Sequence, residues 1–134
     1  MGIFDFLKSK TEKKFVSEKA FTRNLNKQTE MSPVTLNQLR ELEVNDSSYL
    51  KLEFFFYTDS VSKAENLADE LKSLNYSVDF GVSPGDKNLF SITGWTTKML
   101  MTNTVVQNWT KSMCEIGYQF DCDFDGWGTT PSQY

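Results

Sequence analysis

Three aspartates at alternate positions near the end of the chain have the spacing that most suggests chemistry. They lie in DCDFDG, residues 121–126, which has the form of the start of a calcium loop. Such a loop needs a bidentate glutamate at its twelfth position, where this chain has Ser132, and a helix on each side. Apolar and polar side chains instead alternate from Tyr118 to Phe124, the period of a strand with one buried face. The pattern therefore predicts no metal site, but a solvated strand face that runs into a glycine turn.

A pair of carboxylates could also act as general acid and base. In a strand, successive side chains on one face lie about 7 Å apart, and nothing in the local sequence would raise the pKa of Asp121, Asp123 or Asp125. The chain has no histidine, which excludes serine-histidine, cysteine-histidine and histidine-zinc chemistry. It also lacks a glycine-rich phosphate loop. The sequence therefore predicts a protein that is not an enzyme and binds no cofactor.

The composition is that of one small domain. The chain has 134 residues, of which 39% are hydrophobic, enough to fill a core. No stretch reaches the length of a membrane span, and no secretory signal is visible, so we expect a soluble cytoplasmic protein without stable membrane association. Cys114 and Cys122 form neither a CxxC pair nor a metal cluster, and we expect both to be buried thiols.

Charge divides the chain into two parts. Residues 1–33 carry seven Lys/Arg and four Asp/Glu, whereas residues 34–134 carry seven and fourteen. We predict a basic, flexible N-terminal segment over 1–33, which is either a mobile tail or, alternatively, an interfacial anchor or a docking peptide, and an α/β domain over 34–134. The acidic domain would repel a phosphate backbone, which argues against direct binding of nucleic acid and favours a protein partner.

Hydrophobic periodicity then predicts the elements that must position the aspartates. After Ser32-Pro33, a short helix is expected over 34–42. Strands are expected over 49–58, 76–82, 89–99 and 118–124, and helices over 61–74 and from a cap at Thr102 or Asn103 to a left-handed cap at Gly117. The strands over 76–82 and 89–99 are joined by SPGDKN and should form a hairpin.

This order of elements is that of a ferredoxin-like fold of the α+β class. It predicts a βαββαβ sandwich, in which a four-stranded antiparallel sheet of spatial order 4-1-3-2 carries two helices on one face, plus the short N-terminal helix. The helices should cover the following side chains: Leu52, Phe54, Phe56, Val78, Phe80, Val82, Phe90, Ile92, Phe120, Cys122 and Phe124. The opposite face would show Lys51, Glu53, Phe55, Tyr57, Asp79, Thr93, Trp95, Asp121 and Asp123.

Three aromatic residues among carboxylates make an unusual solvent face, so we expect something to cover part of it. Three covers are considered: the chain's own residues 1–45, a partner protein, and a second copy in a homodimer. RNA stacked on the aromatics is disfavoured, because the strand reads NLFSITGW, without the basic and glycine residues of the RNA-recognition signature, and its surroundings are acidic.

The terminal run DGWGT, residues 125–129, allows two interpretations. Gly126 and Gly128 permit backbone conformations closed to other residues, and Trp127 between them offers a large flat surface with one N–H donor. In one interpretation the tryptophan plugs the end of the core. In the other it is an exposed anchor for a partner, because tryptophan is enriched in interface hot spots.

The stretch from about Leu50 to Thr129 resembles the regulator of ribonuclease activity B family, also called the ribonuclease E inhibitor family. The resemblance is carried by the order of elements, by LNYSV after the first long helix, by IGYQFDCDFDGWGT, and above all by Phe124 to Thr129. It implies a ferredoxin-like α/β sandwich without catalytic activity that binds an endoribonuclease and alters RNA turnover. Known members carry a long acidic run after this motif, whereas here nine residues follow Asp125 and a basic segment precedes the domain.

The sequence thus predicts a non-catalytic protein-binding regulator, with an endoribonuclease as the implied partner. The alternative is a self-associating or ligand-binding ferredoxin-like module of an unrelated pathway. The predicted partner-binding residues are Phe55, Tyr57, Trp95, Asp125, Gly126, Trp127, Gly128 and Thr129.

Overall fold

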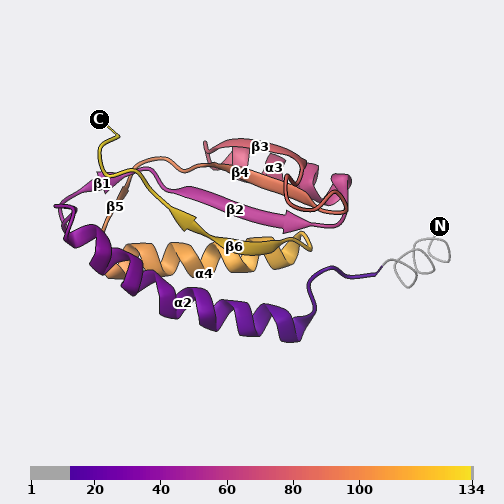
Figure 1. The fold of residues 1–134 in the computed structure, drawn as a ribbon, viewed down its shortest axis with the longest axis horizontal. Coiled ribbons are helices and arrows are strands. Elements are labelled where there is room, and N and C mark those ends of the chain that lie inside the picture. The colour runs from indigo at the N-terminus through magenta and orange to yellow at the C-terminus, as the bar shows by residue number, and fades with distance from the viewer. Residues whose placement is uncertain (1–12, 134) are drawn as a thin grey trace.

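The computed structural model of the chain describes residues 13–133, and the predictions for residues 1–12 lie outside this range. The described elements are α2 (Glu18–Arg40), β1 (Tyr49–Leu50), β2 (Glu53–Thr58), α3 (Val61–Ser73), β3 (Ser77–Val82), β4 (Phe90–Trp95), β5 (Met99–Leu100), α4 (Asn103–Gln119) and β6 (Asp123–Gly128). They form a mixed α/β structure in which the helices pack against an antiparallel sheet (Figure 1).

The main sheet has the strand order β3-β4-β2-β6, and every neighbouring pair is antiparallel. This order agrees with the predicted order 4-1-3-2, and the β3–β4 hairpin is confirmed. The predicted strand over 49–58 is wrong in one respect. Its first two residues leave the sheet and pair with β5 in a separate two-stranded ribbon, and at the break the Leu52 amide donates to the Thr96 hydroxyl rather than to a carbonyl of the ladder.

One hydrophobic core fills the space between the sheet and two helices. Phe54 and Phe56 of β2 are fully buried, and they share this core with Leu67 of α3, Met113 of α4 and Phe124 of β6. The two long helices predicted after β2 and after Thr102 are therefore confirmed, with Thr102 as the N-cap of α4. Large apolar side chains on one strand face bury against both helices, which is the main stabilising contribution of this layer.

The core prediction fails at the outer end of β3. Phe80 is 38% exposed and Val82 is 58% exposed, although both point to the helix-covered face in register with Ile92 and Phe90. The reason is geometric: β3 is the last strand of the sheet, so these side chains have a neighbouring strand on one side only.

The N-terminal helix is much longer than predicted. α2 runs from Glu18 to Arg40, and Pro33, where the sequence analysis ended the basic segment, lies inside it. A proline in a helix lacks the N–H that would bond the carbonyl four residues earlier. That carbonyl belongs to Thr29, and it accepts a hydrogen bond from Gln107 Nε2 of α4 at 2.9 Å instead.

α2 lies beside α4 and along the outer edge of β6 (Figure 1). Its contacts with α4 include the stacked rings of Phe21 and Tyr118 and the 2.8 Å hydrogen bond between the Ser32 and Thr110 hydroxyls. Towards β6, Asn24 donates to the Phe124 carbonyl at 2.7 Å. Of the three covers considered for the open sheet face, residues 13–45 lie beside that face rather than across it, because α2 follows the edge of β6 and the side of α4.

The last helix and last strand also differ from their predicted bounds. α4 continues past Gly117 to Gln119, and Asp121 (φ 58°) takes the left-handed position, with the amide of Cys122 bonded to the Gly117 carbonyl at 2.8 Å. Gly117 is buried inside the helix, where a Cβ would come within 2.9 Å of the Phe56 ring. The strand predicted over 118–124 therefore begins only at Asp123 and extends through the residues predicted to be a turn.

Candidate protein-binding site

β2 divides its side chains between the two faces of the sheet. Phe54, Phe56 and Thr58 are buried against the helices, whereas Glu53, Phe55 and Tyr57 point to the other face and are half-buried. This is the alternation that an antiparallel sheet with one covered face imposes. Within residues 13–133, α3 and α4 pack against the Phe54/Phe56 core, and α2 follows the β6 edge and meets the face of Phe55 only at that margin.

Strand register brings the predicted aromatic residues together on this open face. Trp95 of β4 lies opposite Glu53, and Tyr57 lies opposite Asp123 of β6. Phe55 sits between them, with Thr93 on one side and Gly126 on the other. Phe55, Tyr57 and Trp95 thus form a half-buried aromatic group, which we call the aromatic face, with Glu53 and Asp123 among its neighbours.

A hollow opens from this face at the glycine opposite Phe55. Gly126 has φ 130°, a conformation that other residues rarely adopt, and it lines the hollow together with Phe55. The hollow has a volume of about 260 Å³ and lies between β6 and α2. Its lining comprises Lys27, Gln28, Met31, Ser32, Thr35, Phe55, Asp125, Gly126 and Trp127.

Trp127 lies on the opposite face from Phe55. Its register partner is Phe54, its indole N–H donates to Ser32 Oγ at 3.1 Å, and its ring meets Trp109 edge to face at 6.3 Å between centroids. The tryptophan thus fills the core margin between β6 and α2, as in the first of the two sequence interpretations. The indole is part-buried rather than fully covered, and one side of it lines the hollow.

The remaining predicted residues flank Trp127. Asp125 is exposed at a bulge, where β6 has one residue more than β2 between the pairs Phe56–Phe124 and Phe55–Gly126. Thr129 donates through its hydroxyl to the Lys51 carbonyl at 2.7 Å, which ties the end of β6 to the start of β2. Of the two glycines, only Gly126 needs a left-handed backbone. The role of residues 125–129 in partner binding stays a prediction.

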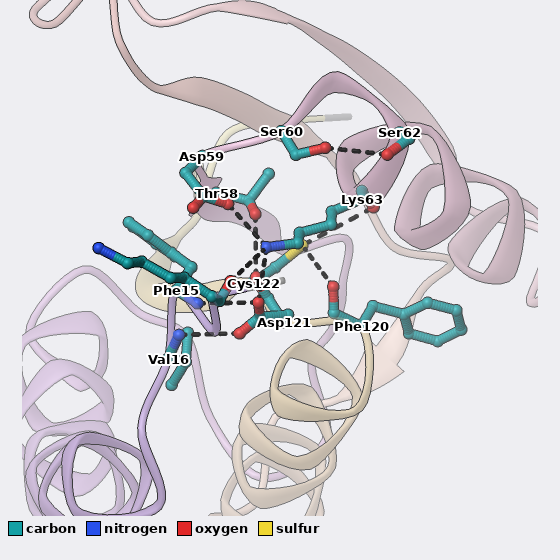
Figure 2. A network of polar contacts seen from close by, with 11 residues as sticks. Phe15, Val16, Thr58, Asp59, Ser60, Ser62, Lys63, Phe120, Asp121 and Cys122 are labelled. Carbon is teal, nitrogen blue, oxygen red and sulfur yellow. Dashed lines mark hydrogen bonds and ion pairs between the residues drawn. The ribbon is translucent and has the colours of Figure 1, made fainter. Parts of the chain in front are cut away.

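Asp121 lies apart from this site. It was predicted to be a solvated residue of a strand, but it precedes β6 and forms an ion pair with Lys63. Its two carboxylate oxygens accept hydrogen bonds from the amides of Phe15 and Val16, each at 2.8 Å (Figure 2). Lys63 Nζ lies 2.7 Å from Asp121 and 2.9 Å from Asp59. The carboxylate therefore fastens the chain that leads into α2 to the start of β6 and to the first turn of α3.

The same contacts set the protonation of this group. Burial alone would raise the pKa of Asp121, but Lys63 and the two backbone amides outweigh it and hold the pKa below its ordinary value of 3.8. Burial would also lower the pKa of Lys63, yet its bonds to Asp121 and Asp59 raise it above 10.5. Asp121 and Lys63 are therefore a charged pair at neutral pH.

The sequence analysis missed the α2 side of the hollow. Lys27, Met31 and Thr35 lie there, and Met31 is 50% exposed. Thr35 falls in the short helix predicted over 34–42, but Lys27 and Met31 fall in the segment that was predicted to be flexible. Over 18–33 the inner side chains of α2 are mixed, since Phe21 and Leu25 are apolar but Asn24, Gln28 and Ser32 are polar, so the apolar period that marks a helix in sequence is weak there.

Residues 13–133 give little support for a reactive thiol, a metal site or a membrane-spanning helix. Cys114 and Cys122 are buried free thiols, as predicted, and burial raises the pKa of each to about 12, so both are protonated and unreactive at neutral pH. Within the same residues, no three His, Cys, Asp or Glu side chains gather to hold a metal ion. None of the helices in that part of the chain combines the length and apolarity needed to span a bilayer.

Comparison with known proteins agrees with the resemblance noted in the sequence. The family model described as regulator of ribonuclease activity B matches residues 29–129, about three quarters of the chain. A comparison with curated proteins gave no match. The matched range contains the whole four-stranded sheet, the aromatic face, α3, α4 and the second half of α2. The chain therefore belongs to the regulator of ribonuclease activity B family.

Proposed function

We propose that this protein is a non-catalytic regulator that binds an endoribonuclease and thereby alters RNA turnover. The family is one of regulators of ribonuclease activity, which supports the kind of partner. The observation that carries the binding site is the aromatic face, since Phe55, Tyr57 and Trp95 lie together on the sheet face opposite α3 and α4. We infer that the sheet with α3 and α4 is a ferredoxin-like sandwich, which leaves one sheet face free for a partner.

The chemistry of this face favours a protein as the ligand. Flat aromatic side chains with acidic neighbours resemble the centre and rim of protein interfaces, in which aromatic anchors carry most of the binding energy. The acidic balance of residues 34–134 disfavours direct contact with an RNA backbone. The hollow beside Phe55 offers a recess for one partner side chain. Asp125 and Trp127, from the predicted run 125–129, line the same hollow, so they can contact the same partner. A cytoplasmic location is part of this proposal.

The absence of catalysis belongs to the same proposal and has support in the side chains. Both thiols are protonated at neutral pH. Burial, with a further contribution from Asp125, raises the pKa of Asp123, but its carboxylate is held by Asn24 Nδ2 at 3.2 Å. An acid-base role would need a second shifted group facing the same space.

Binding to endoribonucleases purified from the same cells tests the proposal. Titration should give a saturable complex, and Phe55→Ala and Trp95→Ala should each weaken it about 5- to 30-fold, as expected for interface hot spots. Tyr49→Ala, which truncates an aromatic residue of the neighbouring ribbon that is 53% exposed, is the matched control and should leave affinity unchanged. Cleavage of a model RNA by the bound nuclease should change accordingly. Equal affinity of all three variants, or no complex with any endoribonuclease, would contradict the proposal.

A further inference from the structure

The strand at the other end of the sheet has an open edge. β3 pairs with β4 on one side, and no strand of residues 13–133 pairs with its other side. The Ser83 amide donates to the Leu89 carbonyl at 2.8 Å, which fixes the phase of the ladder. Because antiparallel hydrogen bonds involve every second residue, Val78, Phe80 and Val82 direct their N–H and C=O groups away from β4. These groups are available to another strand.

This edge lacks the features by which proteins usually block strand pairing. Edge strands are commonly protected by charged side chains, prolines or bulges. β3 has six residues without a bulge, Asp79 is its one charged residue, and Pro84 follows only after the strand has ended. Phe80 and Val82 add exposed apolar surface on the same face of the strand. The edge therefore combines free hydrogen-bonding groups with side chains that gain from being covered.

We propose that this edge pairs with β3 of a second copy of the chain, antiparallel about a two-fold axis at Phe80. In this register Phe80 lies opposite its own counterpart and Val78 lies opposite Val82, so residues with outward N–H and C=O groups face one another throughout. Asp79 falls opposite Gly81, which has no side chain and no heavy atom within 4 Å of an added Cβ. The pairing thus avoids like charges and steric overlap.

The neighbouring registers are less favourable for identifiable reasons. An axis at Asp79 would place two carboxylates directly opposite each other, which destabilises a strand pair. An axis at Gly81 would place Val78 opposite Pro84, which has no N–H to donate. The register about Phe80 gives about six hydrogen bonds between the strands. One short strand buries little area, so the dimer should dissociate on dilution.

Substitutions at Gly81 test both the dimer and its register. The full chain is measured by sedimentation equilibrium, and its mass should rise with concentration from 15.4 kDa towards twice that value. Gly81→Lys places an ammonium opposite Asp79 of the second copy, and Gly81→Asp places a carboxylate there. The first should tighten and the second should weaken the dimer, each by about fivefold, because two such cross-strand pairs form in every dimer.

Gly85 provides the matched control. It also has no heavy atom within 4 Å of an added Cβ, but it lies beyond β3, so Gly85→Lys and Gly85→Asp should leave the dissociation constant unchanged. Thermal unfolding of each variant confirms that the fold is retained. A mass of 15.4 kDa at every concentration up to the solubility limit would overturn the proposal. A dimer that responds equally to both charges at Gly81, or as strongly to Gly85 variants, would do so too. None of these results depends on ribonuclease binding.

Discussion

The two edges of the sheet differ in what lies against them. At β6, the Phe124 carbonyl accepts hydrogen bonds from Asn24 and Gln28 of α2, and the Asp123 carboxylate accepts one from Asn24. At β3, the outward groups of Val78, Phe80 and Val82 meet no strand of residues 13–133. One edge is thus satisfied within the chain, whereas the other can pair with a second molecule.

The residues that bond the β6 edge precede the range of the family match. The match begins at residue 29, so Asn24, Gln28 and the Asp121-bound amides of Phe15 and Val16 come from residues that precede it. In this chain, residues 15–28 therefore make the hydrogen bonds that cover the outer edge of β6 and hold Asp121 just before it. An edge strand without such a cover is a template for pairing with other chains. The contrast predicts different consequences for damage at the two edges.

The largest effect is expected where β3 joins the sheet. A Cβ at Gly94 would overlap the Ser77 carbonyl oxygen and lie 2.7 Å from Phe54 Cζ, so Gly94→Ala must push β3 away from β4. We expect it to lower the free energy of unfolding by about 3 kcal/mol or more. Gly81→Ala, on the facing strand with open space, should change it by less than about 0.5 kcal/mol. Urea denaturation of both variants measures this difference, and equal losses would show that β3 is not held closely at Gly94.

The next largest loss of stability is expected at Asp121, which holds the segment that leads into α2. Asp121→Asn keeps a residue that tolerates the left-handed backbone but loses the charge that binds Lys63 and two amides, so we expect a loss of about 2 kcal/mol at pH 7. Because the pKa of Asp121 is lowered in the folded state, its contribution is fully present above pH 3.8 and is lost as the pH falls through the folded pKa.

The difference between wild type and Asp121→Asn should therefore shrink on acidification below pH 3.8. Asp123, whose pKa is raised, has the opposite dependence, but it is present in both proteins and cancels in the difference. Denaturant unfolding from pH 7 to pH 2 gives this curve. A difference that stays constant down to pH 2 would mean that the charge of Asp121 does not stabilise the fold.

A smaller loss of stability is expected at Asn24, which bonds α2 to the edge of β6. Asn24→Ala removes the 2.7 Å hydrogen bond to the Phe124 carbonyl and the bond to Asp123, leaving only Gln28 at 3.4 Å. We expect a loss of about 1 kcal/mol in the free energy of unfolding. Asn26→Ala, an exposed amide on the same helix, is the matched control and should be nearly neutral. The two variants are compared by thermal unfolding, and equal stability would show that α2 does not close the β6 edge through this residue.

The fold was predictable where burial follows a simple period. The spacing of Leu67 and Leu71 identified α3, and the alternation around Phe54 and Phe56 identified β2 and its buried face. Only the end of α2 was predicted, where Leu36 and Leu39 are buried in the core; its earlier part was missed because polar side chains such as Asn24 interrupt the apolar residues of the inner face. Pro33 was a misleading boundary, because Gln107 replaces the hydrogen bond that the proline removes. Such compensation depends on tertiary contacts and cannot be read from local sequence.

The site was predictable in part for a related reason. Strict alternation places Trp127 on the face opposite Phe124, and therefore with Phe55. The extra residue Asp125 in the bulge reverses this, so that Trp127 shares the core face with Phe124 and Phe54. The glycine pattern indicated an unusual backbone at Gly126, but not that it would be a bulge within a strand. Phe55, Tyr57 and Trp95 are on the face predicted for them, because the extra residue lies in β6 and leaves the alternation of β2 and β4 unchanged.

Hydrogen exchange at the two edges tests the central contrast most directly. The amides of Val78, Phe80 and Val82 point outward from β3, so in dilute solution they should exchange quickly, whereas the Ser77, Asp79 and Gly81 amides should be protected by β4. Protection of the first three should rise with protein concentration as copies pair, while the amides of β6 should be unaffected. Outward β3 amides that are protected to the same degree at every concentration would contradict this account, because the edge would then already be closed within one chain.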